Sequence, residues 1–219
     1  MKQGYFITGT DTNVGKTVAT VALMRYFKQQ GQSVLAMKPV AAGAELQRGQ
    51  LRNEDALLLQ ANATVDVGYD LINPYVFALP VSPHLAAGDA TVSLEVIAEH
   101  FNTLKHLADI VLVEGAGGWY TPLNATQTIC DLASALSLPV ILVVAVKLGC
   151  LNHAQLSYQA IVQSGSSCAG WLAVHVDRQQ LLPEANIATL QARLPIPLLG
   201  VLPFQDDLDF DVLAGCLAL

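Results

Sequence analysis

The amino-acid sequence predicts an α/β fold, a doubly wound and mostly parallel sheet with helices on both faces. Short apolar runs alternate with longer stretches of helical periodicity, which is typical of parallel strands joined by crossover helices. Hydrophobic residues make up 53% of the 219 residues and charged residues only 13%, enough apolar material for large buried surfaces. No repeat, linker or low-complexity segment interrupts the alternation, so we expect a single domain over residues 1–219.

The expected elements follow one another in a regular order. They are a strand at 5–8, a helix from about 15 to 31, a strand at 33–40, a short helix at 53–61, a short strand and surface loop within 72–88, a helix at 93–107, a strand at 109–118, a short helix at 128–137, a strand at 140–146, a helix at 152–163, a strand at 169–175, a helix at 184–194 and a strand at 198–202. The missing Cβ of Gly31 suits the end of the first helix, and Asn53 suits the N-cap of the second, which has acids in its first turn. Three prolines within 72–88 predict the surface loop, and the apolar run LPVILVVAV at 138–146 predicts a buried strand.

Charge and composition exclude several classes of protein. A net charge of −7 argues against a nucleic-acid-binding protein, which usually gathers a basic surplus on one face. The longest apolar run, 138–146, is well short of the roughly 18 residues of a membrane span, and MKQGYFITGT at the start lacks the apolar core of a signal peptide. Four widely spaced cysteines, Cys130, Cys150, Cys168 and Cys216, predict reduced thiols in a cytoplasm rather than a disulfide framework or a zinc site. The low charged fraction and the mean hydropathy of +0.43 favour a homo-oligomer that hides apolar surface.

The stretch GTDTNVGKT, residues 9–17, is close to a phosphate-binding loop. In the standard pattern four residues separate a glycine from the Gly-Lys pair, whereas here Thr10 holds the place of that glycine and Gly9 comes one step earlier. The context fits, because a strand is expected before the loop and a helix after it. Helix N–H groups would then bind phosphate oxygens, Lys16 would neutralise the β- and γ-phosphates, and the Thr17 hydroxyl would ligate Mg²⁺. The alternative is a plain glycine-bearing turn, which the GKT triplet disfavours.

Three further charged residues are expected near the same edge of the sheet. Glu114 comes at the end of the apolar run that starts after Asp109, and ligands of doubly wound sheets bind where strands end, so we expect a metal-binding acid there rather than the cap of a turn. Asp55 is a weaker candidate from its pattern, since an acid in the first turn of a helix is commonly a dipole partner. Lys38 ends the second expected strand, where it is either solvated or placed to stabilise charge on a transferring phosphoryl group.

Seven segments together resemble the dethiobiotin synthetase family. They are GTDTNVGKT, KPVAAG, RNEDALLLQ, NPYVFALPVSPH, VLVEGAGGWYTPL, LPVILVVAVKLGCLNHA and PLLGVLP, in that family's order across nearly the whole chain. The resemblance implies a P-loop NTPase fold and a homodimer that forms dethiobiotin from 7,8-diaminononanoate, CO₂ and ATP with Mg²⁺. It implies that one amine captures CO₂ as a carbamate, whose oxygen attacks the γ-phosphate, and that the second amine closes the mixed anhydride to a cyclic urea.

The resemblance also implies roles for individual residues. The residues around the carbamate and phosphates are Thr12, Lys16 and Lys38, and those that hold Mg²⁺ are Thr17, Asp55 and Glu114. The nucleotide-binding positions are Asn13, Val14, Gly15, Lys16, Thr17, Val18, Glu114, Gly115, Ala116, Gly117, Val174, His175, Pro203, Phe204 and Gln205. The substrate-binding positions are Ala42 and, from the neighbouring subunit, Gly149, Cys150, Leu151 and Asn152. Asn152 is expected to cap a helix whose N-terminus binds the substrate carboxylate.

Two residues depart from the pattern of the family. Ala42 stands where the family usually has a serine, which removes one hydroxyl contact. Val174 stands where the family usually has an asparagine that reads the purine edge, so His175 or backbone groups at 203–205 take over, or base selectivity is relaxed. A divergent nucleotide-binding regulator therefore stays open as an alternative. A partitioning-type ATPase is a second alternative, although Asp11 stands where that class has a signature lysine.

Overall fold

The computed structural model describes residues 3–88 and 90–219, so Met1, Lys2 and Asp89 of the expected 1–219 domain lie outside the described residues. Within these ranges, one six-stranded sheet has the order β10-β9-β8-β1-β7-β2. Its strands are β10 (Leu198–Leu202), β9 (Cys168–Val174), β8 (Val140–Ala145), β1 (Gln3–Gly9), β7 (Ile110–Gly118) and β2 (Val34–Met37). Every neighbouring pair is parallel. From β1 the chain goes to β2 at one edge, returns to β7 beside β1, and then runs through β8 and β9 to β10 at the other edge. The expected doubly wound α/β fold is confirmed.

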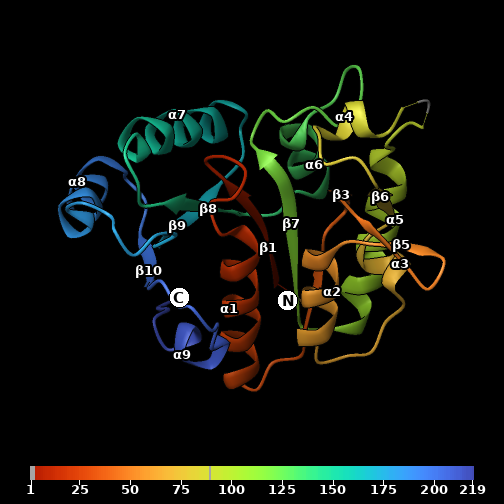
Figure 1. Cartoon of the computed structure of the whole chain (residues 1–219), viewed down its shortest axis with the longest axis horizontal. Helices are drawn as coiled ribbons and strands as arrows, with labels where there is room; N and C mark the ends of the chain where they lie inside the picture. The colour runs from red at the N-terminus through yellow and green to blue at the C-terminus, as the bar shows by residue number, and fades with distance from the viewer. Residues whose placement is uncertain (1–2, 89) are drawn as a thin grey trace.

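Helices cover both faces of this sheet (Figure 1). On one face lie α1 (Lys16–Gln29) and α9 (Phe210–Ala214), and on the other lie α5 (Leu94–Leu107), α6 (Ile129–Leu136), α7 (Cys150–Gln163) and α8 (Pro183–Arg193). Successive strand residues point to opposite faces. Phe6 is therefore buried in the core under α5 and α6, whereas Ile7 is buried in the core under α1. Because helices cover both faces of the sheet, we expect the site at its carboxyl edge.

The strand expected at residues 33–40 is interrupted, which corrects the prediction. β2 ends at Met37, and Lys38 donates its N–H to the carbonyl of Ile72 rather than to the sheet. Pro39 has no N–H, so the ladder cannot continue through it. The chain then forms β3 (Val40–Ala42), which pairs in parallel with β6 (Tyr75–Phe77) in a separate two-stranded sheet. Lys38 thus lies just beyond the strand, where the chain leaves the sheet.

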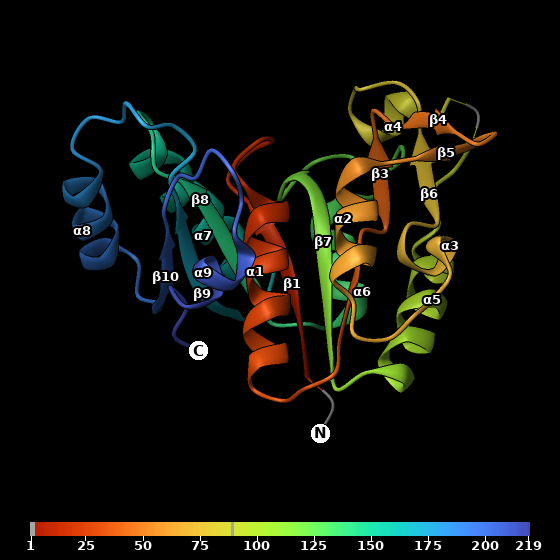
Figure 2. The same cartoon turned by 60° about the horizontal axis from the view of Figure 1, so that its bottom comes forward.

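The segment after β3 holds more structure than the sequence predicts. β4 (Glu45–Gln47) and β5 (Gln50–Arg52) form an antiparallel hairpin, whose turn places Arg48 and Gly49 at positive φ. α2 (Glu54–Asn62) follows, and the expected cap is confirmed because the Asn53 side chain accepts the N–H of Ala56. α3 (Tyr69–Ile72) and α4 (Pro83–Ala86) are single turns. In Figure 2 the hairpin, β3, β6 and α4 stand together beyond one end of the sheet.

The longer helices agree with the sequence in type and position. Ser93 caps α5 by accepting the N–H of Val96, and Gly31 has the positive φ expected after the end of α1. The short helix α9 was not expected. Within the part of the chain that the structure describes, no helix combines the length and the apolar character needed to cross a membrane.

Candidate active site

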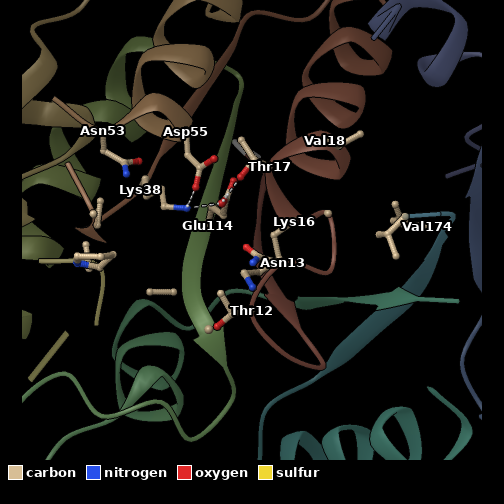
Figure 3. Close-up of a pocket in the computed structure, with 18 of the residues that line it drawn as sticks. Thr12, Asn13, Lys16, Thr17, Val18, Lys38, Asn53, Asp55, Glu114 and Val174 are labelled. Carbon is tan, nitrogen blue, oxygen red and sulfur yellow. Dashed lines mark hydrogen bonds and ion pairs between the residues drawn. The ribbon is translucent and has the colours of Figure 1, made fainter. Parts of the chain in front are cut away.

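A cleft of about 930 Å³ lies at the carboxyl edge of the sheet. Figure 3 shows its centre, where the loop after β1, the end of β2, the start of α2 and the end of β7 meet. Most of the expected site residues line it: Thr12, Asn13, Gly15, Lys16, Thr17, Val18, Lys38, Ala42, Asp55, Glu114, Ala116, Gly117, Val174, His175, Pro203, Phe204 and Gln205. The segments that carry them are distant in sequence, and the winding of the sheet brings their ends together.

The loop after β1 opens the N-terminus of α1 toward the cleft. Asn13 and Gly15 have positive φ, and a Cβ on Gly15 would lie 2.7 Å from a methyl carbon of Val174, so glycine is required there. The first N–H of the helix to be bonded within it is that of Ala19, which reaches the Gly15 carbonyl. The N–H groups of Lys16, Thr17 and Val18 precede it and are available to an anion.

Lys16 is held by its own loop. Its Nζ donates to the carbonyl oxygen of Asp11 at 2.7 Å, and the residue is only 7% exposed. Burial lowers the pKa of Lys16 to about 8, although the Glu114 carboxylate acts in the opposite direction. An anionic ligand would favour the ammonium form, because it brings further negative charge close to Lys16.

A compact cluster of charged groups lies beside the helix start. Lys38 Nζ donates to Asp55 Oδ2 at 2.5 Å and to Glu114 Oε1 at 2.7 Å, and the Thr17 hydroxyl donates to the same Glu114 oxygen at 2.8 Å (Figure 3). The side chain of Glu114 is fully buried, whereas that of Asp55 is 43% exposed. Lys38 therefore joins the two carboxylates and is the counter-charge of the buried one.

The pKa values in this cluster reflect mutual stabilisation. Burial alone would lower the pKa of Lys38, but the carboxylates of Glu114 and Asp55 outweigh it and hold that pKa above its ordinary value. Burial would raise the pKa of Asp55, but the charge and hydrogen bond of Lys38 hold it below its ordinary value. Both groups are consequently charged at neutral pH.

The oxygen atoms of this cluster fit a magnesium ion that arrives with a nucleotide. Mg²⁺ is usually bound through one or two carboxylates together with phosphate oxygens, and Thr17, Asp55 and Glu114 provide such a donor set. Glu114 Oε2 is buried without a hydrogen-bond partner, so it retains a free acceptor. Among the described residues no three His, Cys, Asp or Glu side chains gather into a metal cage.

The far side of the cleft is more apolar. Val174 ends β9 with 4% exposure, and in Figure 3 it lies across the start of α1 from the Lys38 cluster. Phe204 follows β10, with the Arg178 guanidinium 5.6 Å above its ring. The Gln205 side-chain oxygen accepts the N–H of Asp209, which leaves its NH₂ group as a donor. A flat ring bound here would meet methyl groups at Val174, where no side-chain hydrogen bond can form.

Comparison with known proteins assigns this arrangement to a family. A family model described as an AAA domain matches residues 3–211. The chain is 47% identical over 206 residues to ATP-dependent dethiobiotin synthetase BioD 1 of Salmonella typhi, an alignment that covers 93% of this chain and 90% of that protein. The chain belongs to the dethiobiotin synthetase family. It is also 48% identical over 201 residues to ATP-dependent dethiobiotin synthetase BioD of Xylella fastidiosa strain 9a5c, with 91% and 89% covered.

Solved structures of lower identity share the fold of this dethiobiotin synthetase family member. The septum site-determining protein MinD of Pyrococcus horikoshii OT3, complexed with Mg-ADP, matches with a TM-score of 0.55 at 17% identity, over 93% of this chain and 82% of that one. A chain of the MinC:MinD complex of Aquifex aeolicus matches with a TM-score of 0.59 at 16% identity, over 95% and 85%. At these identities the likeness concerns the fold alone.

Some of the expected site residues do not line the cleft. Val14 is fully buried, so only its backbone can face a ligand, and Gly115 lies against Phe6 and Ile129 inside the core. The segment 149–152 is absent from the lining as well. Its helix corrects one prediction: α7 starts at Cys150 with Gly149 as N-cap in the left-handed region, so Asn152 lies within the first turn and is not the cap. A glycine with φ of 93° starts the helix before Asn152 is reached.

The cleft also contains residues that the sequence analysis did not expect in the site. They are Val40, Ala41, Gly43, Asn53, Pro80, Val81, Ser82, Pro83, Thr121, Val176 and Leu208. The segment NPYVFALPVSPH signalled several of them, but only as part of the family pattern. Thr121 has a structural role, because its hydroxyl accepts the N–H of Gly118 and closes the turn after β7. A Cβ on Gly117 would lie 2.4 Å from that hydroxyl oxygen, which explains the glycine.

Proposed function

We propose that this protein is an ATP-dependent dethiobiotin synthetase, a ligase of biotin biosynthesis. It converts 7,8-diaminononanoate, CO₂ and ATP to dethiobiotin, ADP and phosphate. The observation that carries the proposal is the meeting of Lys16, Lys38, Thr17, Asp55 and Glu114 at the open N-terminus of α1. The relatives named for this activity align over nearly the whole chain, which supports the same assignment.

The loop after β1 binds the triphosphate in this proposal. The free N–H groups at the start of α1 donate to phosphate oxygens, and Lys16 lies beside them as a cation whose depressed pKa the phosphates raise. Positioning and charge neutralisation are what phosphoryl transfer requires of a protein. The position of the loop residues in the lining of the cleft supports this role.

Thr17, Asp55 and Glu114 are proposed to hold Mg²⁺ with the nucleotide. When bound there, Mg²⁺ neutralises charge on the phosphate oxygens of ATP. The chain contributes the free Oε2 of Glu114, the half-exposed carboxylate of Asp55 and the hydroxyl of Thr17. The buried position of Glu114 keeps one of these oxygens away from bulk water.

Lys38 and Thr12 are proposed to act on the carbamate. An oxygen of the carbamate forms a bond to the γ-phosphorus while the bond from that phosphorus to the ADP oxygen breaks. The second amine then attacks the carbonyl carbon, loses a proton, and expels phosphate as the ring closes. Lys38 is placed to stabilise negative charge on the transferring group, and Thr12 offers a hydroxyl at the cleft wall. Ala42 lines the same cleft without a hydroxyl.

We further propose a homodimer in the cytoplasm, with 1–219 as one domain. The N–H groups of Leu151 and Asn152 precede the first bond within α7, from the N–H of His153 to the Gly149 carbonyl, so they can receive the carboxylate of a substrate held by a partner. Leu148, just before α7, is fully exposed, and Leu156 within α7 is 57% exposed. Apolar exposure of this kind supports an interface between subunits.

A phosphate-release assay tests the function directly. Dethiobiotin synthetase activity requires both diaminononanoate and bicarbonate, so omission of either should reduce phosphate release to background. A partitioning-type ATPase would release phosphate without the diamine and respond to a macromolecular partner, and a regulator would turn over with neither. Light scattering on the purified protein tests the homodimer separately, because a monomer at micromolar concentration would contradict it.

A further inference from the structure

A buried chain of hydrogen bonds lies behind the Lys38 cluster. Asn73 Nδ2 donates to the Lys38 carbonyl at 2.7 Å, Asn73 Oδ1 accepts the Tyr69 hydroxyl at 2.8 Å, and that hydroxyl accepts the N–H of Asn53 at 2.8 Å. Asn73 is 1% exposed, and Tyr69 and Asn53 are each 7% exposed. We call Asn53, Tyr69 and Asn73 the Tyr69 relay. Its two ends are the backbone of Lys38 and the N-cap of α2.

Lys38 and Asp55, which form the shortest contact in the site, lie at these two ends. Lys38 follows the end of β2, so no bond of the main sheet fixes its carbonyl. Asp55 lies in the first turn of α2, next to the N-cap residue Asn53, as Figure 3 shows. Neither residue is anchored to the other by the main sheet. The relay spans the gap between them; its members Tyr69 and Asn73 lie outside the cleft lining, whereas Asn53 is part of it.

Every side-chain polar atom of Tyr69 and Asn73 is used. The Tyr69 hydroxyl both donates and accepts, and the Asn73 amide donates to two carbonyls, those of Lys38 and Tyr75, and accepts once. The ring of Tyr69 is held from its face by the Arg52 guanidinium, 4.1 Å from the centroid. A fully satisfied buried network specifies one arrangement, because any shift leaves a polar group unpaired.

We propose that the Tyr69 relay sets the position of Lys38 relative to Asp55, and that Tyr69 and Asn73 are positioning residues for phosphoryl transfer. The inference rests on the proposed function, since it assigns to these residues the geometry of that reaction. Groups behind a site that orient its ligands typically change metal affinity or activity by about 10–100-fold when removed. Neither residue lines the cleft, so the effect is transmitted through Lys38 and Asp55.

The test is Tyr69→Phe, which keeps the ring over Arg52 and removes only the hydroxyl. We expect kcat to fall about tenfold with KM for ATP changed less than about twofold. The affinity for Mn²⁺ in the presence of ADP, measured by electron paramagnetic resonance, should weaken about tenfold as well. Asn73→Asp, which replaces the donor to the Lys38 carbonyl by an acceptor, is a second variant with at least the same expected loss.

Tyr75→Phe is the matched control. The Tyr75 hydroxyl accepts the N–H of Ser93, the N-cap residue of α5, so this change removes the same kind of bond at a different helix start. Both phenylalanine variants should lower Tm to a similar degree, but Tyr75→Phe should keep kcat and Mn²⁺ affinity within about twofold. All assays are run at a temperature at which circular dichroism shows the variants folded.

The outcomes separate the relay from the function. If Tyr69→Phe and Asn73→Asp match Tyr75→Phe in kcat and Mn²⁺ affinity, the relay is mere scaffolding and the inference is wrong, while the proposed function stands. If the native chain forms no dethiobiotin, the proposed function is wrong. The Mn²⁺ measurement with ADP still tests the relay in that case, since it requires no turnover.

Discussion

Replacement of Lys38 by methionine tests the cluster in depth. Lys38→Met keeps the apolar stem and removes the ammonium, so the fully buried carboxylate of Glu114 loses its counter-charge. Removal of one partner of a buried pair typically costs about 3–5 kcal/mol. The low end applies here, because the Thr17 hydroxyl still donates to Glu114 and the Asp55 side chain, 43% exposed, can turn to water. For a chain of this size about 3 kcal/mol corresponds to a fall in Tm of about 6–12 °C.

Differential scanning calorimetry in EDTA measures this fall. Mg²⁺ should then raise the Tm of Lys38→Met more than that of the native protein, because in the native protein the ammonium already neutralises the two carboxylates that hold the metal and repels a second cation there. Lys28→Met, at an exposed lysine in the last turn of α1, is the control and should change stability by less than about 1 kcal/mol. A Tm of Lys38→Met within the range of that control would refute the assignment of Lys38 as the counter-charge of Glu114.

Four further outcomes are expected. Lys16→Ala should abolish phosphate release, because Lys16 is the cation at the helix start that binds phosphate; substantial retained kcat would contradict the site. The pKa of Lys16, about 8 in the folded chain against 10.5 ordinarily, means that the unfolded chain binds more protons between these values, so stability without ligand should rise with pH across that window. Nucleotide affinity should change in the opposite direction and weaken above pH 8 by up to about tenfold per pH unit, because the phosphates favour the ammonium form of Lys16. Calorimetry should show proton uptake on binding, and a constant affinity up to pH 9.5 would be inconsistent with this. The charged groups that face Lys16 are Glu114, Lys38, Asp55 and Asp11. Because Val174 offers no hydrogen bond to the base, kcat/KM for ATP should lie within about tenfold of kcat/KM for GTP. Val174→Asn should increase the preference for ATP about fivefold. A native preference for ATP above roughly a hundredfold would show that another group reads the base.

The regular part of the fold could be predicted from the sequence because its signals are local. Apolar runs give the strands, helical periodicity gives α1, α5, α7 and α8, and Asn53 marks the start of α2. The phosphate loop was likewise recognisable, since its residues are contiguous. Even local signals compete, however: an asparagine is a good N-cap, yet Gly149 in the left-handed region starts α7 earlier than Asn152.

The parts that escaped prediction depend on contacts between distant residues. The partner of Thr17 is Glu114, 97 residues away, and that of the Lys38 carbonyl is Asn73, 35 residues away. The spacing of Tyr69 and Asn73 in the sequence does not predict a connection to Asp55, because the hydrogen bonds that connect them form only when α2 and α3 have packed together. The interruption at Pro39 had a signal, the missing N–H, but the destination of the chain in a second small sheet had none.

An oxygen-isotope experiment tests the central claim most directly, that a carbamate of the diamine meets the γ-phosphate at this edge of the sheet. Enzyme, ATP, diaminononanoate and freshly dissolved ¹⁸O-labelled bicarbonate are mixed and quenched within one turnover, before label exchanges with water, and the phosphate is analysed by mass spectrometry. Since the carbamate oxygen that attacks phosphorus leaves with it, the account predicts one ¹⁸O atom in each phosphate released together with dethiobiotin. Phosphate that carries only its original oxygens or one from unlabelled water would contradict it.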